Sequence, residues 1–219
     1  MGTSTVLRRA TFLLVAAALM APLGAAAQTN GWGSGSAAPT MADLVPKMRS
    51  EEAYSERYNF EADLEGGGRV KVNFTISNLG FSDGSAQSRL RIDTGEDVTY
   101  SYKKKYGSGD WSYGEKDFKL KEPKTTIEGS GESTFTVRHT GKHKGEAVDV
   151  ELTFRSPMPM WQPGGGTLQV SDSDYYTVHL LGMRSSVDGE MTIGDKTWEL
   201  TADRSGYADH VSTNIAPYS

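Results

Sequence analysis

The sequence predicts an all-β protein, built as an antiparallel meander that closes as a barrel or folds into a strongly curved sandwich. Three observations lead to this prediction. Apolar and polar residues alternate in several segments, and this period of two is typical of strands with one buried and one solvated face. Turns rich in glycine separate the segments, and 25 of the 219 residues are glycine. About ten such segments follow one another at spacings of about 8–14 residues, as in a sandwich or barrel.

The clearest strands are expected at residues 69–79 and 148–155. In the first, Val70 and Phe74 alternate with Lys71 and Asn73. Four shorter strands are expected at residues 58–64, 89–93, 135–138 and 175–181. Glycine tolerates the backbone angles of tight turns, so the glycine-rich stretches between these runs are interpreted as turns.

The chain is divided into three parts on composition. Residues 1–27 carry Arg8 and Arg9, an apolar run and a small-residue end at Ala25–Ala27, which is typical of a secretory signal peptide. Residues 28–52 are interpreted as a flexible linker with one short helical turn. Residues 53–219 form the predicted β-domain. The export signal has a bacterial character, so the expected location is the periplasm or outside the cell.

Charge and composition exclude several functions. The net charge is −5 and becomes about −7 once the signal peptide is removed, which argues against nucleic acid and anionic membranes as partners. The chain has no cysteine, so thiol catalysis and thiolate metal sites are ruled out. The four histidines lack the spacing of a metal motif, so no metal or other cofactor is expected. No apolar run after the signal peptide is long enough to cross a membrane.

The most polar segment lies close to the end, at residues 204–210. Asp209 and His210 form a carboxylate and imidazole pair after a predicted strand, and Gly206 is expected to allow a sharp turn there. Such a pair can transfer protons near neutral pH, which makes both residues candidate catalytic groups. The alternative is a structural role, in which Asp209 caps a turn and His210 bonds a backbone carbonyl.

Five further residues are candidate ligand-binding groups. Aromatic side chains are common in amphipathic cavities of exported barrels, although they also fill cores. Tyr176, His179, Trp198 and Tyr207 are expected near a barrel opening. Trp161 lies in a proline-rich loop and is interpreted either as part of the rim or as a plug at one end.

Three segments resemble a known group of proteins. They are Glu56–Leu64 (ERYNFEADL), Met160–Gly166 (MWQPGGG) and Gly206–His210 (GYADH). The layout from residue 53 to 210 is similar to the first domain of the lipocalin-like calycin superfamily that includes AttH-type proteins, carotenoid hydratases and fungal survival factors. Members usually have two such domains, and a Trp-Gly pair commonly follows the His, where this chain has Val211–Thr213.

The resemblance implies a lipocalin-like barrel and three possible functions. The leading hypothesis is an exported protein that binds a hydrophobic small molecule, such as a lipid or isoprenoid. The alternative is a carotenoid-hydratase-like lyase that adds water to an isoprenoid double bond, with Asp209 as proton donor. The third is one structural half of a two-domain protein, completed by a second β-domain or by a homodimer.

Overall fold

The computed structural model describes residues 31–32, 38–79, 83–95 and 98–216. The predicted signal peptide and part of the predicted linker lie outside these residues. The described chain contains two short 3-10 helices and twelve strands. The helices are η1 (Met41–Leu44) and η2 (Glu65–Gly67). The strands are β1 (Ser55–Asp63), β2 (Arg69–Ser77), β3 (Ser85–Asp93), β4 (Thr99–Tyr106), β5 (Ser112–Tyr113), β6 (Lys119–Lys121), β7 (Thr125–Ser130), β8 (Thr134–His143), β9 (Glu146–Arg155), β10 (Thr167–Gln169), β11 (Tyr175–Ile193) and β12 (Lys196–Thr213).

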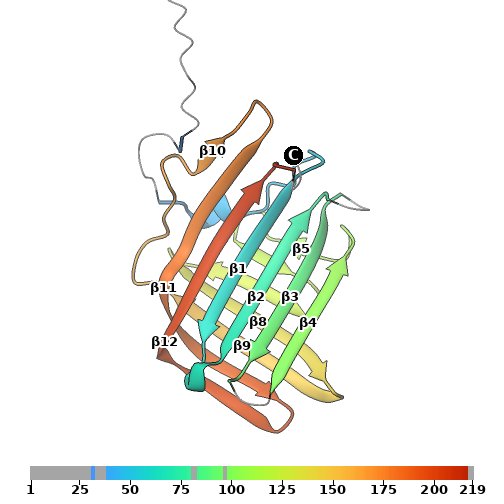
Figure 1. Ribbon diagram of the computed structural model, residues 1–219, viewed down its shortest axis with the longest axis vertical. Helices are drawn as coiled ribbons and strands as arrows, with labels where there is room; N and C mark the ends of the chain where they lie inside the picture. Colours follow the sequence, from blue (N-terminus) through green and yellow to red (C-terminus); the bar gives the residue numbers. More distant parts are fainter. Residues whose placement is uncertain (1–30, 33–37, 80–82, 96–97, 217–219) are drawn as a thin grey trace, which may run out of the picture.

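All twelve strands belong to one antiparallel sheet that is strongly curled (Figure 1). The strand order is β4-β3-β2-β1-β12-β11-β9-β8-β7-β6-β5, and the short β10 pairs with β11. The sheet folds over so that β1 to β4 form one layer, while β5 to β9 form a second layer behind it (Figure 1). The predicted fold class, an antiparallel meander curved like a lipocalin barrel, is confirmed.

Two long strands connect the layers. β11 and β12 pair along most of their length, and the pairing slips at three points between Leu180 and Gly189. Such bulges bend a strand without ending it. The second half of β11 pairs with β9, whereas the second half of β12 pairs with β1. The sequence predicted only short strands here, so the length of this hairpin is a difference from expectation.

Gly206 lies inside β12 rather than at a turn after a strand. A β-carbon at this position would collide with Val187 Cγ2 and would lie only 3.0 Å from Phe154 Cδ1. The glycine is therefore required by close packing at the bend between the two layers, and not by a sharp turn of the backbone.

The apolar stripes of the strands pack against one another between the layers. Phe60 of β1 contacts Phe135 of β8 and Phe154 of β9, with ring centroids 5.6 and 5.4 Å apart. Phe118 lies 5.9 Å from Phe135 and 5.2 Å from Tyr58. These rings are fully buried, so the space in which a hydrophobic ligand was expected is occupied by side chains at this level of the fold.

Polar side chains connect the two ends of the sheet. His139 of β8 is 1% exposed and bonds the Tyr100 hydroxyl of β4 at 3.0 Å and the Thr125 hydroxyl at 2.9 Å. Thr125 also accepts a hydrogen bond from Ser88 of β3 at 3.2 Å. Burial lowers the pKa of His139 to about 4, so the imidazole is neutral near pH 7. Side-chain hydrogen bonds thus join β3 and β4 of the front layer to β7 and β8 of the second layer.

The segment before β1 packs over one end of the sheet. Leu44 in η1 is fully buried, and its carbonyl accepts a hydrogen bond of 2.6 Å from Tyr58. Asn78 donates to the carbonyls of Arg49 and Glu51. Residues 38–54 therefore cover the interior of the protein. The sequence predicted a flexible linker with one short helical turn at residues 28–52, and η1 lies within that range.

Candidate functional site

The candidate site begins with a buried carboxylate on β1. Residues of like parity on this strand share one face, and Glu56, Tyr58 and Phe60 all face the interior. Glu56 is fully buried. It accepts hydrogen bonds from the hydroxyls of Tyr54 and Tyr58, the second at 2.7 Å. A buried charge is tolerated only when it is paired and hydrogen-bonded, so the carboxylate requires these partners.

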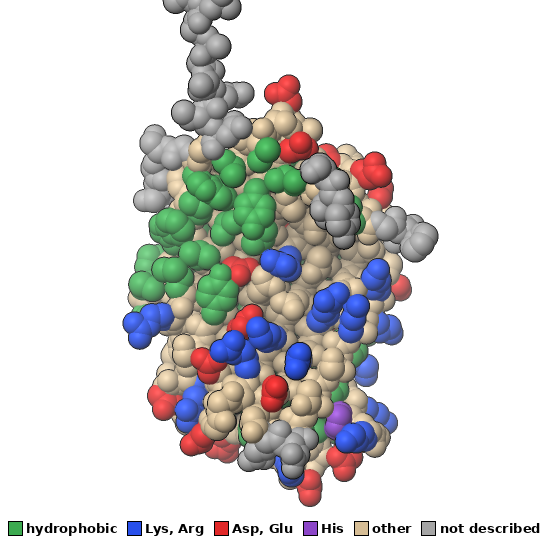
Figure 2. All heavy atoms as spheres, viewed as in Figure 1, with side chains coloured by type: hydrophobic (Ala, Val, Ile, Leu, Met, Phe, Trp, Pro, Cys, Tyr) green, Lys and Arg blue, Asp and Glu red, His purple; other side chains and the backbone are tan. Residues whose placement is uncertain are grey.

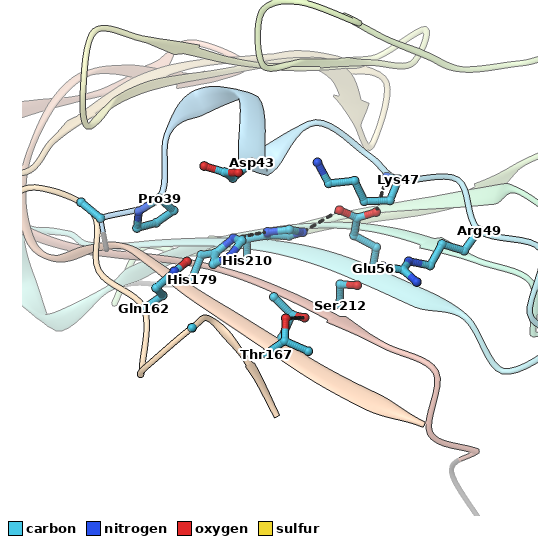
Figure 3. Close-up of a pocket in the computed structure, with 13 residues that line it drawn as sticks. Pro39, Asp43, Lys47, Arg49, Glu56, Gln162, Thr167, His179, His210 and Ser212 are labelled. Carbon is cyan, nitrogen blue, oxygen red and sulfur yellow. Dashed lines mark hydrogen bonds and ion pairs between the residues drawn. The ribbon is translucent and has the colours of Figure 1, made fainter. Parts of the chain in front are cut away.

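Two histidines extend this carboxylate across the next two strands. His210 of β12 lies directly between Tyr58 of β1 and His179 of β11 in the register of the sheet. Its Nε2 is 2.7 Å from Glu56 Oε1, and its Nδ1 is 3.1 Å from His179 Nδ1. The Tyr58 ring stacks on the His210 ring, with centroids 4.3 Å apart and planes at 10°. Glu56, His210 and His179 form one continuous chain, named here the relay (Figure 3).

The proton arrangement of the relay depends on the charge of Glu56. Burial alone raises the pKa of Glu56, but the hydrogen bond and charge of His210 and the hydroxyls of Tyr54 and Tyr58 lower it below its usual range. An ionised Glu56 accepts a proton from His210 Nε2. The direction of the bond between His210 Nδ1 and His179 Nδ1 depends on the tautomers of the two rings. When His179 Nδ1 is the donor, the other nitrogen of His179, Nε2, is unprotonated.

The His179 side chain forms part of the wall of a pocket. Within the described residues, His179 Nε2 has no hydrogen-bond partner in the protein, and the His179 side chain lines a pocket of about 350 Å³. Burial, followed by the neighbouring His210, lowers the pKa of His179 to about 4. His179 is therefore neutral near pH 7.

Polar and charged groups make up most of the pocket lining. They are Asp43, Lys47, Arg49, Glu56, Gln162, Thr167, Thr177, His179, His210 and Ser212, together with Ala38, Pro39 and Gly165. Lys47 and Arg49 come from the segment that covers the sheet end, and Gln162 comes from the loop after β9 (Figure 3). Hydrogen bonds from Thr40 lower the pKa of Asp43, so this carboxylate is ionised. The pocket holds both charge signs beside one neutral imidazole.

A second pocket of about 430 Å³ lies on the other side of the same covering segment. It is lined by Ala38, Pro39, Thr40, Met41, Ala42, Gly131, Glu132, Pro159 and Met160. This lining is mainly apolar, and Ala38 and Pro39 line both pockets. A polar pocket that contains His179 and a mainly apolar pocket therefore lie next to each other.

Asp209 and His210 lie on opposite faces of β12, since successive residues of a strand point to opposite sides. His210 is buried in the relay, whereas Asp209 lies on the outer face and is held by Asn59, which itself accepts a 2.6 Å bond from Asn73. The pair does not act as one acid–imidazole couple in this geometry.

The five predicted ligand-binding residues are also divided. His179 lies in the relay. Tyr176, Tyr207 and Trp161 lie on the outer side of the β10–β12 region, where Trp161 is 45% and Tyr207 is 37% exposed. Burial and the hydrogen bond to Asp209 raise the pKa of Tyr207. Trp198 lies opposite Met191 near the hairpin end of β11 and β12 and packs against the core.

Glu56 is the functional residue that sequence reasoning missed. A signal was present, because Tyr54, Glu56, Tyr58 and Phe60 share one strand parity, which places an acid on an otherwise apolar face. No group of three or more His, Asp or Glu side chains in the described part of the chain has the geometry of a metal site. No helix among the described residues is both long and apolar enough to cross a membrane.

The fold is a strongly curled antiparallel β-sheet with a chain of polar side chains in its interior. Three solved structures have similar folds. An AttH-type protein from Nitrosomonas europaea matches with a TM-score of 0.56 and 9% identity, over 75% of this chain and 52% of that chain. CghA with Sch210972 matches with a TM-score of 0.55 and 16% identity, over 85% of this chain and 52% of that chain, and kievitone hydratase from Nectria haematococca matches with a TM-score of 0.55 and 12% identity, over 85% of this chain and 57% of that chain. These are AttH-like and hydratase-like calycin-fold proteins, so the fold expected from the sequence resemblance is confirmed.

The chain spans about half the length of these solved structures. No protein-family model matches the sequence, and no curated protein matches it. At these identities the likeness concerns the fold.

Proposed function

We propose that this protein is a lyase of the hydratase type, which adds or removes water through acid–base catalysis by the relay. The observation that carries the proposal is the unbroken chain from buried Glu56 through His210 to His179, whose side chain lines a pocket. In the proposed arrangement His210 is neutral, the proton of His179 is on Nδ1, and His179 Nε2 is the basic nitrogen. A general base must lie within hydrogen-bond reach of bound substrate, and His179 is the group of the relay that meets this need. The hydratase-like fold of kievitone hydratase supports the same reaction class.

The relay explains how a weakly basic imidazole acts as a base. When His179 Nε2 takes a proton, the proton on its Nδ1 passes to Nδ1 of His210. The positive charge then rests on His210, beside the carboxylate of Glu56 at 2.7 Å. An opposite charge at this distance stabilises the imidazolium, so Glu56 sets the basicity of a nitrogen two side chains away.

The pocket chemistry favours a β-hydroxycarbonyl compound and its conjugated alkene. An isolated alkene requires a strong acid, whereas Asp43 and Glu56 are ionised. In the dehydration direction, His179 Nε2 takes the proton from the carbon next to the carbonyl, and Lys47 and Arg49 stabilise the negative charge on the carbonyl oxygen. The C–O bond then breaks, and His179 returns the proton to the departing hydroxyl, which leaves as water.

The test measures turnover and binding together on hydrophobic β-hydroxyketones and conjugated enones, with exchange of the α-hydrogen in D₂O as the readout. His179→Gln and Glu56→Gln are expected to lose about 10²- to 10⁴-fold in turnover and to keep binding. Asp209→Asn is the matched control, since it removes a carboxylate on the other face of β12. Loss of turnover in Asp209→Asn with full turnover in His179→Gln would overturn the relay and favour Asp209 as the proton donor.

A carrier of a hydrophobic small molecule is the second candidate function. The apolar pocket lined by Met41, Pro159 and Met160 supports it, because burial of apolar ligand surface provides affinity. A carrier would bind these compounds without exchange or turnover, and Met160→Gln would weaken binding while His179→Gln would not. The opposite pattern would exclude a pure carrier.

We also propose that the protein is exported and that its mature form starts near Gln28. The apolar run after Arg8 and Arg9 supports this. N-terminal sequencing of protein recovered from the cell exterior or periplasm tests it, and recovery only as the full chain in the cytoplasm would refute it.

A further inference from the structure

The outer face of the front layer is the solvent side of β1 to β4 together with residues 176–180 of β11 and 207–213 of β12. It has an apolar part and a basic part (Figure 2). Hydrophobic side chains gather over the β10–β12 region at the upper left of the view, and Lys and Arg side chains lie across the middle and right. This division contrasts with the net negative charge of the whole chain.

The apolar part follows two neighbouring strands. On β11, Tyr176, Val178 and Leu180 face outward, and on β12 Tyr207 and Val211 do so, with Val178 directly opposite Val211. Exposed Trp161, beside Leu180, and exposed Met183 extend this area. A contiguous exposed apolar area of this kind marks an interaction site, and Tyr and Trp are the residues that favour a membrane–water interface.

The basic part contains cations without counter-charges. Arg57, Arg89, Arg91, Lys103 and Lys105 point outward from β1, β3 and β4, and in the described part of the chain none of them has an ion-pair partner. The carboxylates of this face are fewer than its cations: Glu61 and Asp63 are engaged by Lys71 and Arg69, and Asp93 and Asp209 also lie on this face. The excess charge of this area is therefore positive.

Like charges also face each other across the strands. Arg89 is directly opposite Lys103, and Lys71 is directly opposite Arg91. Like charges at such positions destabilise a sheet. Protection of a sheet edge explains lysines on β4, but β1 and β3 are interior strands, so Arg57 and Arg89 need another explanation. An anionic partner provides one.

A hollow connects the two parts. It has a volume of about 450 Å³ and is lined by Ser55, Arg57, Asn73, Thr75, Gln87, Arg89, Tyr176, Val211 and Thr213. This lining contains two guanidinium groups and several hydroxyl and amide donors, and it contains no carboxylate. Arginine forks match phosphate oxygens well, and Tyr176 and Val211 form the side of the hollow next to the apolar part.

We infer that this outer face binds an anionic lipid surface, with a phosphate headgroup in the hollow between Arg57 and Arg89 and the apolar part against the acyl boundary. Cations with adjacent apolar and aromatic side chains are the combination that binds such surfaces. A symmetric contact between two copies through this face would bring the same cations together, which disfavours a homodimer here. The inference is independent of the relay, which lies on the other face of the sheet.

Co-sedimentation of the purified chain with vesicles tests the inference. Vesicles of phosphatidylcholine with phosphatidylglycerol are expected to bind the protein at low salt, and vesicles of phosphatidylcholine alone are expected to bind it weakly. The double variant Arg57→Gln/Arg89→Gln is expected to bind about thirtyfold more weakly, from the usual effect of two cations near an anionic surface. Trp161→Gln/Met183→Gln is expected to weaken binding to the same vesicles at high salt.

The matched control is Lys142→Gln/Lys196→Gln, which removes two exposed cations near the ends of other strands. Neither lysine has an ion-pair partner among the residues that the structure describes. It is expected to bind like wild type, as is His179→Gln. Urea unfolding of each variant checks that it folds. Equal binding by the two charge variants, no preference for phosphatidylglycerol, binding of inorganic phosphate without vesicle binding, or a dimer broken by Trp161→Gln/Met183→Gln would each overturn the inference.

Discussion

Acid is expected to destabilise this protein through its two buried neutral histidines. His139 is 1% and His179 is 6% exposed, and the pKa of each is lowered to about 4 from an ordinary 6.5. The unfolded chain binds a proton at each imidazole as the pH falls below about 6.5, while the folded protein binds it only near pH 4. The unfolded state therefore binds more protons in this window, and stability falls as the pH falls.

The magnitude follows from these two pKa values. Between pH 7 and pH 5, each imidazole lowers the free energy of unfolding by about 2 kcal/mol, so the pair lowers it by about 4 kcal/mol. Glu56, with its lowered pKa, adds a loss in the same direction only below about pH 4.5. The range from pH 7 to pH 5 thus isolates the histidines.

Urea unfolding at a series of pH values measures the effect. His139→Gln is expected to lower stability at pH 7, because it removes the hydrogen bonds to Tyr100 and Thr125, and to halve the dependence on pH. His143→Gln is the matched control, since it keeps both buried imidazoles and should keep the full dependence. If the free energy of unfolding of His139→Gln depended on pH as strongly as that of the wild type, the reasoning would be refuted. His139 would then take up its proton equally in the folded and unfolded states.

Three further predictions concern packing and surface charge, each measured by urea unfolding. Gly206→Ala should lower the free energy of unfolding by about 1–3 kcal/mol, because the added methyl group collides with Val187 and Phe154. Gly109→Ala should lower it little, because the space around Gly109 is open. Equal losses in the two variants would contradict the packing role of Gly206. Phe135→Ala should cost about 3–5 kcal/mol, since its buried ring joins the two layers, and a loss under about 1 kcal/mol would show that the core tolerates the cavity. Arg138→Gln should cost less than about 1 kcal/mol despite two 2.9 Å ion pairs, because these pairs are exposed; a larger loss would mean that the network is shielded from water.

The alternation of side chains predicted most of the strands. Residues 69–79 correspond to β2 and residues 148–155 to β9, because a strict period of two leaves little doubt about which face is buried. The same rule was not applied to Asp209 and His210, which are neighbours in sequence and therefore point to opposite faces of a strand. Glycine at position 206 suggested a turn, since the collision that requires a glycine there comes from residues 187 and 154, far away in the sequence.

The candidate site was only partly predictable for a related reason. His179 was predicted within a strand and His210 in a polar segment after a strand, and their contact depends on the register between β11 and β12. Glu56 joins them from a third strand that is 154 positions away from His210. Single-strand patterns give the face on which a residue lies, and they contain no information on which strands become neighbours.

The long β11–β12 hairpin has a consequence for how the protein unfolds. Because each of its strands is hydrogen-bonded within both layers, neither layer can open without breaking pairs that hold the other. Unfolding should then be a single cooperative transition, and the backbone amides of β2 and β8 should exchange with deuterium through the same global opening.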